Sequence, residues 1–285
     1  MKQNRAGTTF WVYRIYVAAF FIFLAAPLVA AASFAFNDSL FPSLPWQGFT
    51  LDWFFNDTEP KLGMFYDRRL LSGIYYSFLI AGVVSALSVF VGTCNAFLFM
   101  RNDFPAKNFF YILMIMPLVI PGVILGISIL VLASTIANGV EDTYGLQLEF
   151  LRPGIILVVL GQFSFITTIT TLVIAARLKK FDISMEEAAL NLGASRARVL
   201  ATITLPFLRP AMIAAAIVAF LVSFENFNTS LFLVGSETPL TITMYDRMAK
   251  VGSTPVLNAV SFALIVGSGL LALLSFSVQR SKPEG

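Results

Sequence analysis

A single acidic side chain, Glu225, lies deep within a long apolar run of residues at about 210–234. It lies roughly 22 Å along that run at the rise of an α-helix, past the middle of a membrane. A carboxylate buried there costs about 2.5 kcal/mol or more, so its presence predicts a functional site. Two flanking phenylalanines could bind an organic cation beside it by cation–π contact, and polar residues at i+3 and i+4 would share its helical face. If the helix ends sooner, Glu225 is instead a residue of the outer rim. The candidate solute contacts are Phe224, Glu225, Asn226, Phe227, Asn228 and Thr229.

A polar, helix-prone stretch, SMEEAALNLGASRARVLATITLP, covers residues 184–206 between two apolar runs. Ser184 and Glu187 have the spacing of a capping box, which predicts the start of a helix. Gly193 fits the end of that helix, and Ser195 can cap a second one. We expect the second helix to end just before Pro206, because proline cannot continue a helix. One apolar stripe with a small centre, suited to close contact with another protein, is formed by Met185, Ala188, Ala189 and Leu192.

The composition excludes most enzyme chemistries. The chain has no histidine, which excludes Ser-His-Asp hydrolysis and HExxH zinc sites. Its one cysteine, Cys94, cannot form an intrachain disulfide and is expected to be a small buried residue. No GxxxxGK[ST] phosphate loop is present, so the chain is not an ATPase, and energy must come from a partner. We therefore predict no catalytic residue, no metal ligand and no cofactor in this chain.

Six apolar runs have the length needed to cross a bilayer, so we predict an all-α polytopic membrane protein with one domain over residues 1–285. Of the 285 residues, 58% are hydrophobic and 12% are charged, a composition typical of proteins whose main solvent is lipid. The first run imitates a secretory signal but is too long, and we interpret it as a retained helix. The spans are about 10–36, 71–100, 109–134, 154–176, 210–234 and 256–278.

The distribution of basic residues predicts the orientation. With both termini in the cytoplasm, 13 of the 19 lysines and arginines fall on the inner side, which satisfies the positive-inside rule. The loop at 177–209 is then cytoplasmic. The net charge of +3 reflects this topology, and it predicts no nucleic-acid partner.

Two spans carry features that break or join helices. Pro117 and Pro121 in the third span are expected to kink or break it, and Gly122 with Gly126 favours close helix packing over a role in lining the pathway. Polar residues of the fourth span are interpreted first as hydrogen-bonding partners between helices and only second as solute contacts. They are Gln162, Thr167, Thr168, Thr170 and Thr171.

The cytoplasmic loop resembles the EAA loop of bacterial ABC importer permeases. Seven signature positions are filled: Glu187, Ala188, Ala189, Gly193, Ile203, Leu205 and Pro206. The resemblance implies a type I permease fold whose loop forms coupling helices. These dock on a cytoplasmic ABC ATPase dimer, which binds ATP and Mg and passes its closure to the membrane helices.

Longer segments are similar to the PotC-type permeases of spermidine and putrescine importers, namely NDSLFPSLPWQGFTLDWF, MPLVIPGVILGISILVL and SFENFNTSLFLVGSETPLTITMYDRMAKVGSTPVLNAVS. The resemblance implies alternating-access uptake of a polyamine across the bacterial inner membrane. The implied partners are a periplasmic substrate-binding protein and a second, PotB-like permease in a heterodimer. The acidic positions of that group are aspartates, so Glu225-Asn226 departs from its pattern. The alternative substrate is an opine, a betaine or another small charged compound.

Other classes of protein remain as alternatives. A secondary carrier or channel would need a pathway within one chain or a symmetric oligomer, typically with inverted repeats. The sequence shows no internal repeat and one deep acid. A membrane enzyme would need a cluster of acids or histidines near one interface, and none is present.

Overall fold

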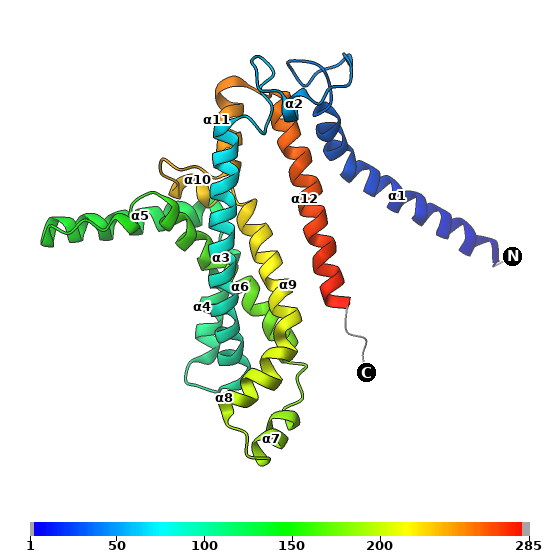
Figure 1. Ribbon diagram of the computed structural model, residues 1–285. Helices are drawn as coiled ribbons and strands as arrows, with labels where there is room; N and C mark the ends of the chain where they lie inside the picture. The colour runs from blue at the N-terminus through cyan, green and yellow to red at the C-terminus, as the bar shows by residue number, and fades with distance from the viewer. Residues whose placement is uncertain (1–2, 281–285) are drawn as a thin grey trace. The chain divides into compact units, whose positions relative to one another are not determined.

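The computed structural model describes residues 3–280, and the surroundings of side chains over residues 10–273. Residues 1–2 and 281–285, part of the two ends predicted to be cytoplasmic, lie outside the described residues. Figure 1 shows a chain built almost wholly of helices. In chain order these are α1 Gln3–Phe34, α2 Asp52–Phe55, α3 Arg68–Arg101, α4 Lys107–Val119, α5 Gly122–Tyr144, the 3-10 turn η1 Glu149–Leu151, α6 Ile155–Leu178, α7 Ser184–Asn191, α8 Arg196–Val199, the π turn η2 Leu200–Thr204, α9 Leu205–Phe224, α10 Ser230–Leu233, α11 Leu240–Val251 and α12 Pro255–Arg280.

Within residues 3–280, six helical segments are long and apolar enough to cross a membrane. This confirms the predicted fold class, an all-α polytopic membrane protein. The segments are Phe10–Phe34, Arg68–Arg101, Gly122–Tyr144, Ile155–Leu178, Arg196–Phe224 and Pro255–Leu273.

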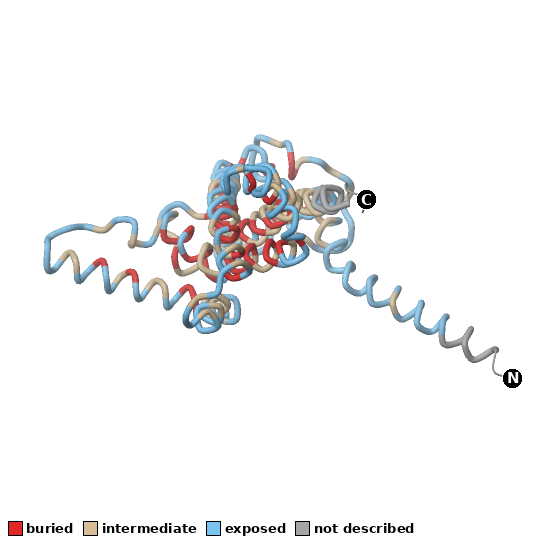
Figure 2. Tube along the Cα trace, turned by 90° about the horizontal axis from the view of Figure 1, so that it is seen from below, coloured by how far each residue is buried: buried red, intermediate tan, exposed pale blue. Residues whose placement is uncertain are grey.

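The chain divides into two compact units, residues 1–71 with 246–267 and residues 72–245 with 268–285. That both belong to one permease domain stays a prediction. Burial differs strongly between helices (Figure 2). More than half of the apolar window of α6 is buried, at 56%, whereas none of the window of α1 is buried. The side chains of α1 are therefore available to lipid or to another chain.

The third predicted span, 109–134, is wrong as a single helix. Helix α4 ends at Val119, Ile120 is extended with φ −71° and ψ 131°, and α5 begins after Pro121. Proline disfavours helical angles in the residue before it, and this accounts for the break at Ile120. Pro117 stays inside α4, so only one of the two prolines breaks the helix.

The fifth predicted span, 210–234, is also wrong at both ends. The helix begins before Pro210, runs on from Arg196 through η2 and stops at Phe224. Residues 225–229 are irregular, and α10 is a separate short helix of four residues. The early stop places Glu225 at the end of a helix instead of within one.

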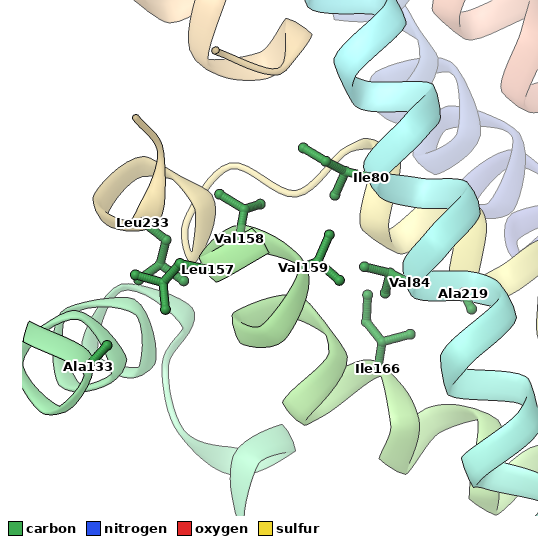
Figure 3. Close-up of a cluster of buried hydrophobic side chains, with 9 residues drawn as sticks. All are labelled: Ile80, Val84, Ala133, Leu157, Val158, Val159, Ile166, Ala219 and Leu233. Carbon is green, nitrogen blue, oxygen red and sulfur yellow. The ribbon is translucent and has the colours of Figure 1, made fainter. Parts of the chain in front are cut away.

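One apolar core holds the second unit together, and Figure 3 shows its side chains converging from several helices. Their burial removes apolar surface from solvent and fixes α6 against α3 and α9. The residues are Ile80, Val84, Ala133, Leu157, Val158, Val159, Ile166, Ala219 and Leu233. A second cluster, nearer to the 177–209 loop, is formed by Ala96, Ile174, Ala175, Leu178, Phe181, Leu208 and Ala215.

Buried threonines of α6 make the predicted hydrogen bonds between helices. Thr170 Oγ1 donates to the carbonyl of Ser88 on α3 at 2.6 Å, and Thr168 Oγ1 donates to the carbonyl of Met114 on α4 at 2.6 Å. These bonds satisfy hydroxyls that an apolar surrounding would otherwise penalise. The expected burial of Cys94 is wrong, because Cys94 lies on the exposed stripe that Leu87, Phe90 and Leu98 form along α3.

Asp67 anchors the start of α3 in the first unit. Its Oδ1 atom accepts from the backbone N–H of Arg69 at 3.0 Å and of Leu70 at 3.1 Å. Its Oδ2 atom pairs with the guanidinium of Arg247 on α11. The Asp67 side chain is buried, so this carboxylate both caps one helix and holds another.

Asp67→Ala is expected to lower the free energy of unfolding by about 2 kcal/mol or more, because it removes the cap and leaves Arg247 unpaired. Asp67→Asn keeps an oxygen for the cap and should cost less. The thermal midpoint of the purified protein in detergent measures both. Asp57→Asn, at an exposed site of the same unit, is the control and should leave the midpoint unchanged. Equal midpoints for Asp67→Ala and Asp57→Asn would contradict the anchoring role.

Candidate functional site

The 177–209 loop contains α7, whose start differs from the predicted capping box. The N-cap position is Ile183, and it makes no side-chain cap bond. The first turn is instead served by Asp182, whose Oδ1 accepts from the Ser184 backbone N–H at 3.0 Å. This bond from the Ser184 amide lowers the pKa of the Asp182 carboxyl below its ordinary value. The predicted capping box is wrong, because the Ser184 amide that Glu187 would accept from is bonded to Asp182, and Glu187 is exposed.

Gly193 ends α7 as predicted. Its φ is +85°, in the left-handed region, and its N–H donates to the carbonyl of Leu190 at 2.9 Å. The next amide, on Ala194, donates to the carbonyl of Ala189 at 3.1 Å. These two bonds make a Schellman motif, which turns the chain sharply and satisfies the last carbonyls of the helix.

The chain then enters a continuous helix, and the predicted stop before Pro206 is wrong. Ser195 caps α8 as predicted, with its hydroxyl accepting from the Arg198 N–H at 3.3 Å. The π turn η2 follows, and Pro206 lies in the first turn of α9. A proline ring clashes with the carbonyl four residues back, and the wider π turn relieves that clash. The loop is thereby joined directly to a long membrane helix.

The outward face of α7 is apolar. The exposed fractions of Met185 and Leu192 are 52% and 89%, and Ala188 is exposed between them. Ala189 is half-buried. An exposed patch of this kind on a rigid, capped helix is suited to contact with a partner protein. The three signature residues that follow the turn at Gly193 are not on α7. Ile203 in η2 and Leu205 in α9 are half-buried, and Pro206 in α9 is exposed.

Glu186, the neighbour of the signature glutamate Glu187, is a functional candidate that the sequence does not indicate. Both carboxylate oxygens of Glu186 accept from the guanidinium of Arg101, at 3.3 and 3.4 Å, where α3 ends. Its Oε1 atom also accepts from the Thr204 hydroxyl at 2.6 Å, in the π turn. Arg101 lies 85 positions away in sequence, so helical spacing carries no signal for this contact.

Glu225 follows the last residue of α9, and the prediction that Asn228 and Thr229 share its helical face is wrong. The helix ends at Phe224, so the spacing of i+3 and i+4 no longer places residues on one side. The Glu225 carboxylate is exposed, and its Oε1 accepts from the Ser268 hydroxyl on α12 at 3.1 Å. Asn228 is also exposed, whereas Thr229 is buried.

The two candidate aromatic residues pack against other rings. Phe224 is buried, with its ring centroid 5.0 Å from that of Phe78. Phe227 is half-buried, with its ring centroid 5.1 Å from that of Tyr245. Both therefore help to hold the 224–229 segment in place.

A chain of hydrogen bonds ties the 224–229 segment to α6 through Gln162, which is 1% exposed. The Ser223 hydroxyl donates to Oε1 of Gln162, and Nε2 of Gln162 donates to the Ser230 hydroxyl at 2.8 Å. The Ser230 hydroxyl donates in turn to Oδ1 of Asn226 at 3.0 Å. Both ends of the irregular segment are thus fixed to one buried amide, as the interpretation of Gln162 as an interhelical partner predicts.

Thr229 lies against glycines of α5, which explains their close packing. A Cβ atom at Gly126 would lie 2.8 Å from the Thr229 carbonyl oxygen, and one at Gly122 would lie 3.2 Å from its hydroxyl. The Gly122 and Gly126 pair therefore packs against the 224–229 segment, in agreement with the packing interpretation.

Gly126→Ala is expected to push the 224–229 segment away from α5, because a backbone oxygen cannot rotate out of the way. The free energy of unfolding should fall by about 1–3 kcal/mol, as in other overpacked cores. Gly139→Ala is the matched control on the same helix, since no atom lies within 4 Å of its added methyl group. The thermal midpoint in detergent compares the two, and a midpoint for Gly126→Ala equal to that of the control would show that the segment can move freely.

The sequence of this chain matches a known protein family and is similar to individual members of known transport systems. Residues 79–281 match the family described as binding-protein-dependent transport system inner membrane component. The putrescine transport system permease protein PotI of Escherichia coli is 28% identical over 258 residues, 90% of this chain and 86% of the relative. The spermidine/putrescine transport system permease protein PotC of the same organism is 28% identical over 270 residues, 95% of this chain and 94% of the relative.

Solved structures agree on the fold. A bacterial ABC transporter involved in the import of the acidic polysaccharide alginate matches with a TM-score of 0.73 and 17% identity, covering 99% of this chain and 98% of that chain. An alginate ABC transporter in complex with an alginate pentasaccharide-bound periplasmic protein matches with a TM-score of 0.67 and 15% identity, covering 96% and 93%.

Proposed function

Since the chain belongs to the family of binding-protein-dependent transport system inner membrane components and is a type I ABC importer permease, we propose that it takes up a small organic cation. The cation is a polyamine of the spermidine or putrescine class, moved by alternating access. The relatives PotI and PotC are named for putrescine and spermidine/putrescine transport, which supports this substrate class.

The observation that carries the proposal is the exposed carboxylate of Glu225 at the broken end of α9. Among the residues that the structure describes, the side chain of Glu225 hydrogen-bonds to a neutral hydroxyl, that of Ser268, so its carboxylate is available to a cationic solute. The segment that carries Glu225 is fixed at both ends by Gln162 and against α5 by the contact with Gly126. A preorganised charge of this kind binds an ammonium group more strongly than a mobile one.

The proposed energy source is a cytoplasmic ATPase dimer that binds ATP and Mg and contacts α7. The exposed apolar face of α7 and the rigid elbow at Gly193 support this contact. We propose two further partners, a second permease of the PotB-like kind and a periplasmic substrate-binding protein. A structural neighbour that was solved with its own periplasmic protein supports the latter.

The chain is a multi-pass membrane protein, and its relatives are inner-membrane components. We propose that both termini and the 177–209 loop face the cytoplasm of a bacterial cell. The excess of lysine and arginine on that side supports the orientation.

The test is uptake into proteoliposomes that contain this chain, its proposed partner permease and the proposed ATPase. The binding protein is supplied on the periplasmic side of the membrane, and ATP is supplied on the cytoplasmic side. Labelled putrescine and spermidine are compared with an opine, a betaine and a neutral sugar. ATP-dependent uptake of the polyamines supports the proposal. Uptake of the opine or betaine alone would move the substrate to another charged compound, and uptake without ATP would favour a secondary carrier or channel.

A further inference from the structure

We propose that Glu186 is the positioning residue through which movement of α7 reaches the membrane helices. This inference rests on the proposed function, because it assumes that an ATPase acts on α7. Glu186 lies next to the signature residue Glu187 but faces the other way. The carboxylate of Glu187 is exposed, whereas that of Glu186 is half-buried and bonded.

Three elements meet at the Glu186 carboxylate. Arg101, at the end of α3, donates to both carboxylate oxygens, and Thr204, in the π turn before α9, donates to Oε1. The side chains of Arg101 and Glu186 are 19% and 23% exposed, and Thr204 is fully buried. A paired carboxylate with a forked guanidinium and a third donor has a fixed geometry, so it resists both sliding and rotation.

Arg101 is itself held from its other side. Its guanidinium lies 5.3 Å from the ring centroid of Phe181, which is buried. Phe181 contacts the ring of Phe207 on α9, with their centroids 5.0 Å apart. A pull on Glu186 is therefore passed to α9 by two routes, through Thr204 directly and through Arg101 and the two rings.

Apart from the covalent turn at Gly193, which joins α7 to α8, few side-chain contacts attach α7 to these helices. Of the described side chains of α7, Glu186 is the one that hydrogen-bonds to other helices, and no α7 residue is fully buried. A groove of about 490 Å³ lies beside Glu186, so the space between α7 and α3 is not filled by packing. The residues lining it include Phe97, Leu190, Arg196 and Leu200. The hydrogen bonds among Glu186, Arg101 and Thr204, here called the polar joint, therefore connect α7 to α3 and η2 in place of apolar side-chain packing.

The first test measures uptake per ATP hydrolysed in proteoliposomes of the complete complex, with labelled putrescine and the binding protein. Glu186→Ala leaves the outward face of α7 intact, so the ATPase should still co-purify and hydrolyse ATP. We expect uptake per ATP to fall at least about five-fold, the lower range of allosteric coupling. Thr204→Val, which keeps the shape and removes the hydroxyl, should lower it less. Asp103→Asn, which breaks an exposed ion pair with Lys107, is the control and should leave the ratio unchanged.

The charge exchange Arg101→Glu with Glu186→Arg restores the ion pair between α3 and α7, but it keeps neither the bond from Thr204 nor the contact with Phe181. It should recover at least half of the lost uptake per ATP, which a general folding defect would not allow. If Glu186→Ala keeps the wild-type ratio in an intact complex, or if the exchange recovers nothing, the inference is overturned. A wild-type complex that shows no ATP-dependent uptake would instead refute the proposed function.

A second readout does not depend on the identity of the solute. Spin labels are placed at Asn102→Cys and Asn191→Cys, both exposed, in a chain with Cys94→Ser. The distance between the labels should be the same with and without ATP in the otherwise wild-type complex, since the joint makes the end of α3 and α7 move together. In the Glu186→Ala complex it should change or broaden with ATP. The same fixed distance in both complexes would also overturn the inference.

Discussion

Replacing Gly193 with valine is expected to reduce uptake about ten-fold or more, with the complex still inserted in the membrane. The φ of +85° places Gly193 in the left-handed region, where a β-branched residue is strained by about 1–2 kcal/mol or more. The chain can relieve that strain only by opening the Schellman bonds to Leu190 and Ala189. The turn at Gly193 would then no longer hold α7 at a fixed angle to α8, and movement of the proposed ATPase would no longer be passed on to α9.

Two further variants test whether the loss of uptake comes from backbone strain at Gly193 itself or from backbone strain anywhere in the protein. Gly145→Val places the same residue at φ +68°, at the end of α5, and should destabilise the protein similarly with uptake largely retained. Gly193→Asn should keep most of the uptake, because asparagine tolerates left-handed angles. A loss with Gly193→Asn as large as that with valine would show that backbone angle is not the reason for the glycine.

Glu225→Gln is expected to lower the uptake of polyamines about ten- to a hundred-fold. The change keeps the size of the side chain and its bond from Ser268 but removes the charge that pairs with an ammonium group. A hydrogen bond to a charged group contributes about 1.5–3 kcal/mol, and each 1.4 kcal/mol corresponds to a factor of about ten. Initial rates of labelled putrescine uptake over a range of binding-protein concentrations measure the effect.

Glu237→Gln provides a closely matched control. Glu237 is also exposed and also accepts from a serine hydroxyl, that of Ser236 at 3.0 Å. It lies beyond α10 and is expected to leave uptake unchanged. If both substitutions had the same effect, a general attraction of cations to the surface would explain the result better than a site at Glu225.

Local chemistry was sufficient for some elements of this structure. The helix end at Gly193 and the cap at Ser195 depend on residues within four positions, and the sequence predicted both. In the described part of the chain, the number of helices long and apolar enough to cross a membrane equals the number of long apolar runs in the sequence. In each case the physical cause lies within a short segment, so the type and spacing of its residues are informative.

The errors arose where one local rule competes with another or with tertiary contacts. Asp182 displaces Glu187 as the partner of the first turn of α7, and a π turn allows Pro206 to stay in a helix that the simple rule would end. The contact of Glu186 with Arg101 joins residues far apart in sequence, and no periodicity indicates it. The helical face assumed for Glu225 depended on a helix that stops one residue earlier.

The bonds around Gln162 have an electrical consequence. The side chains of Ser223, Gln162, Ser230 and Asn226 form a chain of donors and acceptors in which no member carries a net charge. A transmembrane voltage acts on charge, at about 2.3 kcal/mol per elementary charge for each 100 mV. The linkage that holds the 224–229 segment should therefore stay equally firm in energised and de-energised membranes, and within that segment only Glu225 would experience the field.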